Sequence, residues 1–248
     1  MQKTYVLPAL AMFCIIALLL HGPIPQNQDY HHFADQRNIF GIPNFFNVIT
    51  NIPFAIVALF GLREITKADE TKFKNIGFTL FVGFILVTLG SGYYHLWPDN
   101  ETLVWDRIPI TVILMSFFSF LIYDLIDRKT GYKAFIILNL LGIMSVLYWH
   151  LGERQGGGDL RWYAMVQFFP VIAIPLILIL YKSSFNHYRE VIPVFLFFGL
   201  AKLAESFDKE IYHLLNQVIS GHSIKHLFMA GVEFYILRQI ARRVKIGQ

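Results

Sequence analysis

The length, composition and charge of the chain restrict its class. It has 248 residues, of which 55% are hydrophobic and only 15% are charged, and its mean hydropathy is +0.50. One soluble core cannot bury that much apolar surface, so the composition predicts a polytopic membrane protein. The net charge of +4 is spread over loops, which argues against a nucleic-acid-binding face. With Cys14 as the single cysteine, neither a disulfide framework nor a cysteine metal site is expected.

Eight apolar stretches are long enough to cross a membrane as helices. They lie near residues 5–21, 44–64, 76–97, 104–126, 133–150, 161–182, 191–215 and 221–241. No small-x-small cleavage site precedes Gly22, so we interpret the first stretch as an uncleaved N-terminal anchor rather than a signal peptide. The expected fold is all-α, a polytopic transmembrane bundle in which residues 1–248 form one membrane domain.

Basic residues occupy every second connection between these stretches. They are Lys3; Arg63, Lys67, Lys72 and Lys74; Arg128, Lys129 and Lys133; Lys182 and Arg189; and Arg238, Arg242, Arg243 and Lys245. Because basic connections remain in the cytoplasm, the C-terminus is expected there. The intervening connections carry acidic residues, with Arg37, Arg154 and Arg161 among them, and are expected on the non-cytoplasmic side.

Three histidines lie within the apolar stretches, where ionisable groups are functional by default. His222 and His226 are four residues apart, so on a helix they share one face. The alternation of loop charge places them and His95 at one depth near the non-cytoplasmic side. A single histidine there would suit a hydrogen-bonded structural role, but three favour a metal. Imidazole ligands without cysteine indicate zinc, with an open fourth position if the site is catalytic.

Ser91 and Asp106 are expected at the same depth. Ser91 precedes His95 by four residues, and Asp106 opens the following apolar stretch. Taken alone, Ser91 between two glycines is typical of close helix packing. Asp106 alone would suit an interfacial charge paired with Arg107. Their proximity to three histidines gives both residues a second interpretation, as parts of a reaction site.

These motifs carry a family resemblance that covers most of the chain. Ser91-x3-His95, the phrase Trp105-Asp106-Arg107-Ile108-Pro109 and His222-x3-His226 resemble the alkaline ceramidases and the wider superfamily of seven-span membrane hydrolases that includes the adiponectin receptors. The resemblance implies a seven-span hydrolase core over residues 44–241 behind the extra helix at 5–21. It also implies that His95, His222 and His226 hold zinc.

The implied reaction is hydrolysis of the amide bond of ceramide or a related N-acyl lipid, giving a fatty acid and a sphingoid base. Ser91 and Asp106 would assist at the attacking water or the developing oxyanion. The main alternative is a receptor of the adiponectin-receptor type with a structural zinc. A transporter that uses Lys202, Glu205 and the histidines as an ion path is a further alternative, disfavoured because no internal repeat is visible.

The same resemblance raises the question of calcium. In eukaryotic alkaline ceramidases an acidic cluster before the first conserved span holds this ion. Here Asp35 matches the first acidic ligand, but Asn44 stands where a glutamate is usual. Calcium prefers several oxygen ligands, most of them charged. The pattern therefore supports a calcium site at Asp35 and Asn44 only weakly, and a hydrogen-bonded surface loop is the alternative.

Two further polar groups are candidates for structural or substrate contacts. Lys202 and Glu205 are three residues apart in an apolar stretch, and this spacing predicts an ion pair along one helix face, with substrate contact as the alternative. Asp159 and Arg161 follow the glycines at 156–158. That segment could form a mobile cover over the site or a plain connection.

Overall fold

The computed structural model describes residues 3–181 and 188–247, and the described part is mainly helical. The short helices are the 3-10 turns η1 (Lys3–Tyr5) and η2 (Gln28–His31), together with α2 (Phe45–Ile49) and α9 (Asp208–Leu214). The longer helices are α1 (Val6–His21), α3 (Ile52–Ile65), α4 (Thr71–Leu96), α5 (Asn100–Leu125), α6 (Arg128–Arg154), α7 (Arg161–Leu180), α8 (Tyr188–Ser206) and α10 (Gly221–Gly247). The expectation of an all-α fold is confirmed for these residues.

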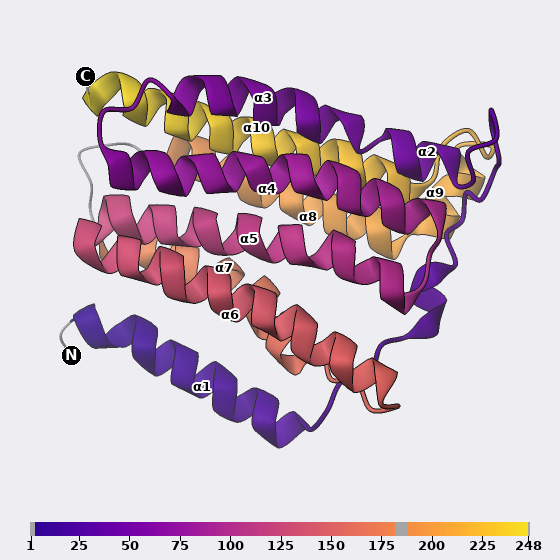
Figure 1. The fold of residues 1–248 in the computed structure, drawn as a ribbon, viewed down its shortest axis with the longest axis horizontal. Helices are drawn as coiled ribbons and strands as arrows, with labels where there is room; N and C mark the ends of the chain where they lie inside the picture. Colours follow the sequence, from indigo (N-terminus) through magenta and orange to yellow (C-terminus); the bar gives the residue numbers. More distant parts are fainter. Residues whose placement is uncertain (1–2, 182–187, 248) are drawn as a thin grey trace.

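The long helices lie side by side as a bundle (Figure 1). The most extensive contacts join α4 to α5, α5 to α6 and α8 to α10, while α3 packs on both α4 and α10. Helix α7 packs on α5 and α6. Within the described residues α7 and α8 share no comparable contact. The ring of helices is therefore least closed between α7 and α8.

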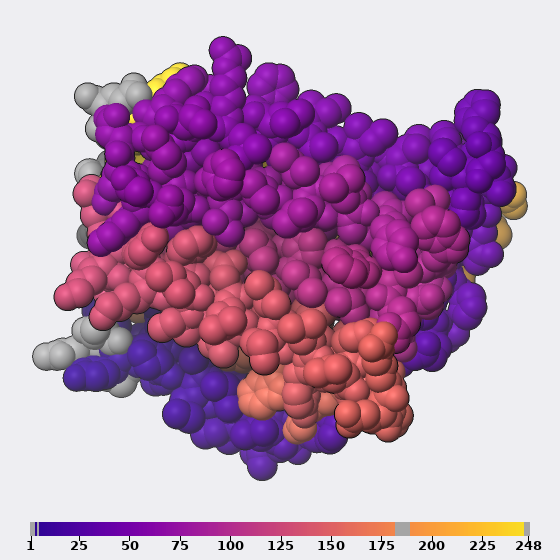
Figure 2. Space-filling model, viewed as in Figure 1, coloured from indigo at the N-terminus to yellow at the C-terminus, as the bar shows by residue number. Residues whose placement is uncertain are grey.

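The surface of the bundle is apolar over much of its length. Figure 2 shows α4, α5 and α6 following one another across one face of the molecule. Large apolar side chains are exposed on α6, among them Ile136, Leu140 and Met144. Water would disfavour such a surface, whereas hydrocarbon accommodates it. The outer face thus agrees with the composition in indicating a multi-pass membrane protein.

Five helical stretches are long and apolar enough to cross a membrane. They are Phe45–Ile65, Thr71–Leu96, Asn100–Leu125, Arg128–Arg154 and Arg161–Leu180, and α1 is a shorter apolar helix. Helices α8 and α10 are not in this group, because charged side chains such as Lys202, Glu205, Lys225 and Glu233 interrupt their apolar sequence.

Two of the predicted stretches are divided. The stretch at 44–64 consists of α2 and α3, with a break at Thr50 and Asn51. Within the stretch at 191–215 the long helix α8 ends at Ser206, and the short helix α9 begins at Asp208. The Asp208 carboxylate accepts the backbone N–H groups of Ala34 at 2.9 Å and His222 at 2.6 Å, so this break connects α9 to two other segments. Lys182, assigned to a basic connection, lies outside the described residues.

The N-terminal helix lies at one edge of the bundle, and the segment after it crosses one end (Figure 1). Helix α1 contacts α7 and has no buried residue. From its end, residues 22–44 cross the end of the bundle towards α2 (Figure 1). This crossing segment closes the end of the bundle at which α4 ends and α10 begins.

Candidate metal centre

His95, His222 and His226 form one cluster at that end of the bundle. The possible ligand atoms of the three imidazoles all lie within 4.8 Å of one another. Their ring centroids are 4.9 Å apart for His95 and His222, and 5.0 Å apart for the other two pairs. All three are buried, and Nδ1 of His95 has no hydrogen-bond partner. An unpartnered buried nitrogen among convergent imidazoles is the arrangement that a metal ion satisfies.

Two glycines allow the surrounding helices to approach closely. A Cβ built on Gly90 of α4 would lie 2.0 Å from the carbonyl oxygen of Trp105 on α5, so a side chain at that position would separate Ser91 from Asp106. A Cβ on Gly221 would lie 2.2 Å from the carbonyl oxygen of Ala204 on α8. Close helix packing of this kind depends on small residues at the contact. Gly90 therefore provides the close helix contact, and the Ser91 hydroxyl is available for another role.

Groups outside the cluster orient its imidazoles. The Thr50 hydroxyl is 2.9 Å from Nδ1 of His226, which leaves Nε2 of that ring available to a metal. The ring of Phe33 packs 4.7 Å, centroid to centroid, from both His95 and His222. Asp208 accepts the backbone N–H of His222 and so fixes the first turn of α10. The positions of these ligands are thus set by residues from the break between α2 and α3, from α9 and from the crossing segment.

Ser91 and Asp106 lie together, as their predicted depth requires. Both are buried, and both line the same pocket, with the Ser91 side chain close to the Asp106 carboxylate. Asp106 does not form the interfacial pair with Arg107 that was its simpler interpretation. Nη2 of Arg107 instead donates to Oε1 of Gln26 at 2.6 Å, and the guanidinium lies 4.2 Å from the centroid of the Trp149 ring.

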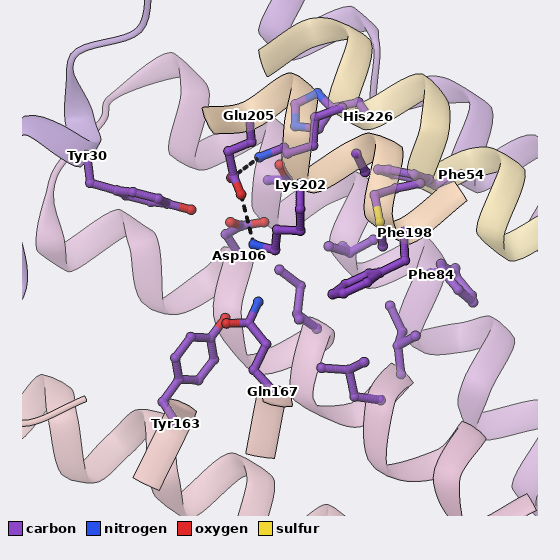
Figure 3. Close-up of a pocket in the computed structure, with 18 residues that line it drawn as sticks. Tyr30, Phe54, Phe84, Asp106, Tyr163, Gln167, Phe198, Lys202, Glu205 and His226 are labelled. Atoms are coloured by element: carbon purple, nitrogen blue, oxygen red, sulfur yellow. Dashed lines mark hydrogen bonds and ion pairs between the residues drawn. The ribbon is translucent and has the colours of Figure 1, made fainter. Parts of the chain in front are cut away.

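A pocket extends from this polar group into the bundle (Figure 3). Asp106, Lys202 and Glu205 lie on one side of it, and the apolar side chains of Phe54, Phe84 and Phe198 lie on the other. Ser91 and His226 also belong to the lining, and the His226 ring packs against Phe54 with ring centroids 6.2 Å apart. The lining includes residues of both α7 and α8. A molecule with a polar group and a long apolar chain matches this division of the lining.

Lys202 and Glu205 form the ion pair that their spacing predicts, and a third residue joins them. Nζ of Lys202 lies 2.8 Å from Oε2 of Glu205. Nζ of Lys225 lies 3.0 Å from Oε1 of Glu205 and 3.0 Å from Nε2 of His222. All three residues line the pocket, so the pair belongs to the site and not to a remote helix face.

The donor set near Asp35 does not fit calcium. Both carboxylate oxygens of Asp35 accept from Arg37, at 2.8 Å and 2.6 Å, and Arg37 also donates to the carbonyl oxygen of Val218 at 2.8 Å. The Asn44 side chain donates through Nδ2 to the carbonyl oxygen of His95 at 2.8 Å. A guanidinium therefore supplies the positive charge beside Asp35, and the loop alternative describes this segment better.

Asp159 and Arg161 are not brought to the pocket. They pair with each other at 2.8 Å, Asp159 accepts the backbone N–H of Ile24, and Arg161 donates to the carbonyl oxygen of Leu18. Their contacts connect the start of α7 to the end of α1. The glycines before them precede this anchored connection, and the pocket lining does not include them.

Several site residues were missed by the sequence analysis. Thr50, Phe33 and Tyr30 are distant in sequence from the histidines, and no spacing indicates their approach to the cluster. Lys225 could have been found, because it lies between His222 and His226 and its charge interrupts an apolar stretch.

The fold and this cluster define an all-helical protein with apolar spans and a buried set of three histidines suited to a metal ion. A family model described as Ceramidase matches residues 39–246, so the chain belongs to the Ceramidase family. Membership implies a hydrolase of lipid amide bonds, associated with a membrane. No curated protein and no solved structure matches the chain.

Proposed function

We propose that this protein is a zinc-dependent membrane hydrolase that cleaves the amide bond of ceramide or a related N-acyl lipid. The observation that carries the proposal is the buried three-histidine cluster, of which His226 lines a largely apolar pocket. Membership of the Ceramidase family supports the same reaction. The products would be a fatty acid and a sphingoid base or similar amine.

The three imidazoles, with no thiolate beside them, suit zinc. When bound, zinc would polarise the amide carbonyl and increase the acidity of water. Asp106 would accept the proton of the attacking water and return it to the departing amine. The Ser91 hydroxyl would donate a hydrogen bond to the oxyanion. Both residues would therefore contact the reacting atoms.

The bundle also accounts for a lipid substrate. The weak contact between α7 and α8 gives an acyl chain a lateral route from the bilayer to the pocket, whose lining both helices share. On this proposal α8 and α10 cross the membrane with the five apolar stretches. Residues 44–241 form a seven-span unit, and α1 is an additional helix.

Metal analysis combined with lipid hydrolysis tests the proposal. Purified wild-type protein is expected to contain zinc and to release fatty acid from ceramide. The His222→Ala variant should lose both properties, because a three-ligand site cannot spare an imidazole. His213→Ala is the matched control, since His213 lies exposed on α9 outside the cluster. A zinc-free wild type that still hydrolyses ceramide, or an active His222→Ala protein, contradicts the proposal.

The proposed orientation has the C-terminus in the cytoplasm and the metal centre towards the non-cytoplasmic face. The basic residues at the far end of α10 support it. Single cysteines at Phe40 and Lys245, in a Cys14→Ser background, can be probed in sealed right-side-out vesicles with a membrane-impermeant thiol reagent. The cysteine at position 40 is expected to react and the one at position 245 is not. The reverse pattern contradicts the orientation.

A further inference from the structure

A cluster of three charged residues forms part of the pocket wall beside the metal centre. Glu205 shares its carboxylate between the ammonium groups of Lys202 at 2.8 Å and Lys225 at 3.0 Å (Figure 3). The pocket holds a second carboxylate, that of Asp106, which interacts with Lys225 through space. The two ammonium groups thus share one hydrogen-bonded carboxylate, that of Glu205.

Lys202 is the more open of the two lysines. Its side chain is 39% exposed, compared with 16% for Lys225. Lys225 contacts both Glu205 and His222, whereas Lys202 has only Glu205 as a hydrogen-bond partner among the described residues. An ammonium carries three N–H donors, so two of those on Lys202 lack a protein acceptor. A partly desolvated charge with free donors is costly unless a ligand satisfies it.

Within the described structure, polar side chains near Lys202 also have hydrogen-bond donors without a protein acceptor. Tyr30, Tyr163 and Gln167 line the pocket and extend their polar ends towards Asp106 and Lys202 (Figure 3). None of these three side chains makes a hydrogen bond through its polar end in the described part of the chain. Burial raises the pKa of Tyr30, so its phenol stays a neutral donor. The polar end of the pocket therefore offers an ammonium and hydroxyl and amide donors to a ligand.

We propose that the polar side of the pocket binds an anionic group in the headgroup of the substrate, with Lys202 as its ion-pair partner. The inference rests on the proposed hydrolase function and narrows its substrate class. The preferred lipid is an N-acyl lipid that carries a phosphate or a carboxylate close to the amide. Such a group accepts hydrogen bonds from the free donors of Lys202 and from the tyrosines. The acyl chain would occupy the apolar end between Phe54 and Phe198.

Substrate preference tests the inference in purified, zinc-loaded protein. Three lipids with the same acyl chain are compared, namely ceramide, ceramide 1-phosphate and an N-acyl amino acid with a free carboxylate. The wild type is expected to have kcat/KM at least about tenfold higher for one of the two anionic lipids than for ceramide, because one charged hydrogen bond contributes about that factor. The two anionic lipids distinguish a phosphate from a carboxylate.

Lys202→Met removes the charge and keeps an unbranched apolar side chain. It is expected to lower the preference for the anionic lipid by about tenfold, mainly by raising KM for that lipid. Lys202→Arg should retain the preference, since the charge remains. Lys209→Met is the matched control, because Lys209 lies exposed on α9 and outside the pocket.

The outcomes separate the two proposals. Hydrolysis of ceramide at the same or a higher kcat/KM than both anionic lipids overturns the headgroup inference and leaves the hydrolase proposal intact. An unchanged preference in a folded, zinc-loaded Lys202→Met protein also overturns it. No hydrolysis of any of the three lipids by zinc-loaded wild type contradicts the proposed function itself. The wild-type comparison decides the inference even where a Lys202 variant does not fold.

Discussion

Buried polar and charged side chains are arranged differently at the two ends of the bundle. At the end away from the histidines, acidic and basic side chains form ion pairs. Glu190 lies 2.5 Å from Arg242 and 3.4 Å from Arg238, and Asp124 lies 2.6 Å from Arg243. At the histidine end, three imidazoles converge, with their possible ligand atoms all within 4.8 Å of one another. Nδ1 of His95 and Nη1 of Arg107 are buried and unbonded, and Lys202 retains free donors.

The same helices contribute to both ends, so helix type does not explain the difference. Helix α5 carries Asp106 at one end and Asp124 at the other, and α10 carries His222 at one end and Arg243 at the other. Charges that pair with each other hold helices together. Charges and imidazoles that converge on an open space require a ligand. The contrast distinguishes structural from functional polar residues within one apolar sequence.

The largest expected effect comes from the two aspartates of α5. Asp106→Asn should lower kcat by about 10²–10⁴-fold with zinc retained, because the amide cannot accept the proton. Asp124→Asn should lower the free energy of unfolding by about 3 kcal/mol, because Arg243 loses a buried partner. Its activity per folded molecule should stay near that of the wild type. Steady-state hydrolysis, zinc content and thermal melting in detergent measure the two effects.

A reversed result would remove the distinction between the two ends. An Asp106→Asn protein that is unstable but fully active would make this carboxylate structural. An Asp124→Asn protein that is stable but inactive would place function at the other end of α5.

The next effect concerns the orientation of a metal ligand. Thr50→Val removes the hydroxyl 2.9 Å from Nδ1 of His226 and preserves the side-chain shape. Loss of such an outer contact typically weakens metal affinity by about 10–100-fold. Competition with a zinc chelator measures the change. Thr88→Val is the control, since the Thr88 hydroxyl bonds only within its own helix. Equal zinc affinity in the two variants would mean that Thr50 does not support the ligand.

The sequence predicted the helices and the core of the site for a clear physical reason. Apolar stretches must be helical in a membrane, and loop charge determines which of their ends meet. That reasoning alone placed His95 at the same depth as His222 and His226, and the structure brings the three together. The pairing of Lys202 with Glu205 followed from helical spacing and is confirmed.

Contacts between segments distant in sequence could not be predicted in this way. The path of residues 22–44 across the end of the bundle brings Phe33 and Tyr30 to the site, and no periodicity encodes that path. The break before Asp208 was also missed, because residues 191–215 are apolar enough to suggest one helix. Its cause is long-range, since the Asp208 carboxylate is satisfied by backbone N–H groups of other segments.

A smaller effect is expected for the ion pair between Asp35 and Arg37 in the crossing segment. Calcium or a calcium chelator should leave the melting temperature of the wild type unchanged, because Arg37 already occupies the carboxylate of Asp35. Arg37→Ala should lower the free energy of unfolding by about 1–3 kcal/mol, since the buried Asp35 loses its partner. Arg63→Ala on the exposed side of α3 is the control. A wild-type melting temperature that rises with calcium would show that this segment is open to a cation.

The smallest expected effect concerns His31, which lies at the histidine end of the bundle and has a hydrogen-bond partner at each ring nitrogen. Its Nδ1 lies 2.9 Å from the Tyr94 hydroxyl and its Nε2 lies 2.9 Å from Oδ1 of Asn100, contacts that suit a neutral ring. Burial lowers the pKa of His31. The unfolded chain therefore takes up a proton near pH 6.5 that the folded protein resists.

The stability that His31 contributes should be complete above about pH 6.5 and should decline as the pH falls below it. In His31→Gln the decline in melting temperature between about pH 7.5 and 5.5 should be shallower than in the wild type. Both proteins keep the three ligand histidines, so the dependence on these residues is common to both and cancels in the difference. Parallel curves would mean that His31 titrates alike in the folded and unfolded states. The contacts with Tyr94 and Asn100 would then accommodate a protonated His31 ring.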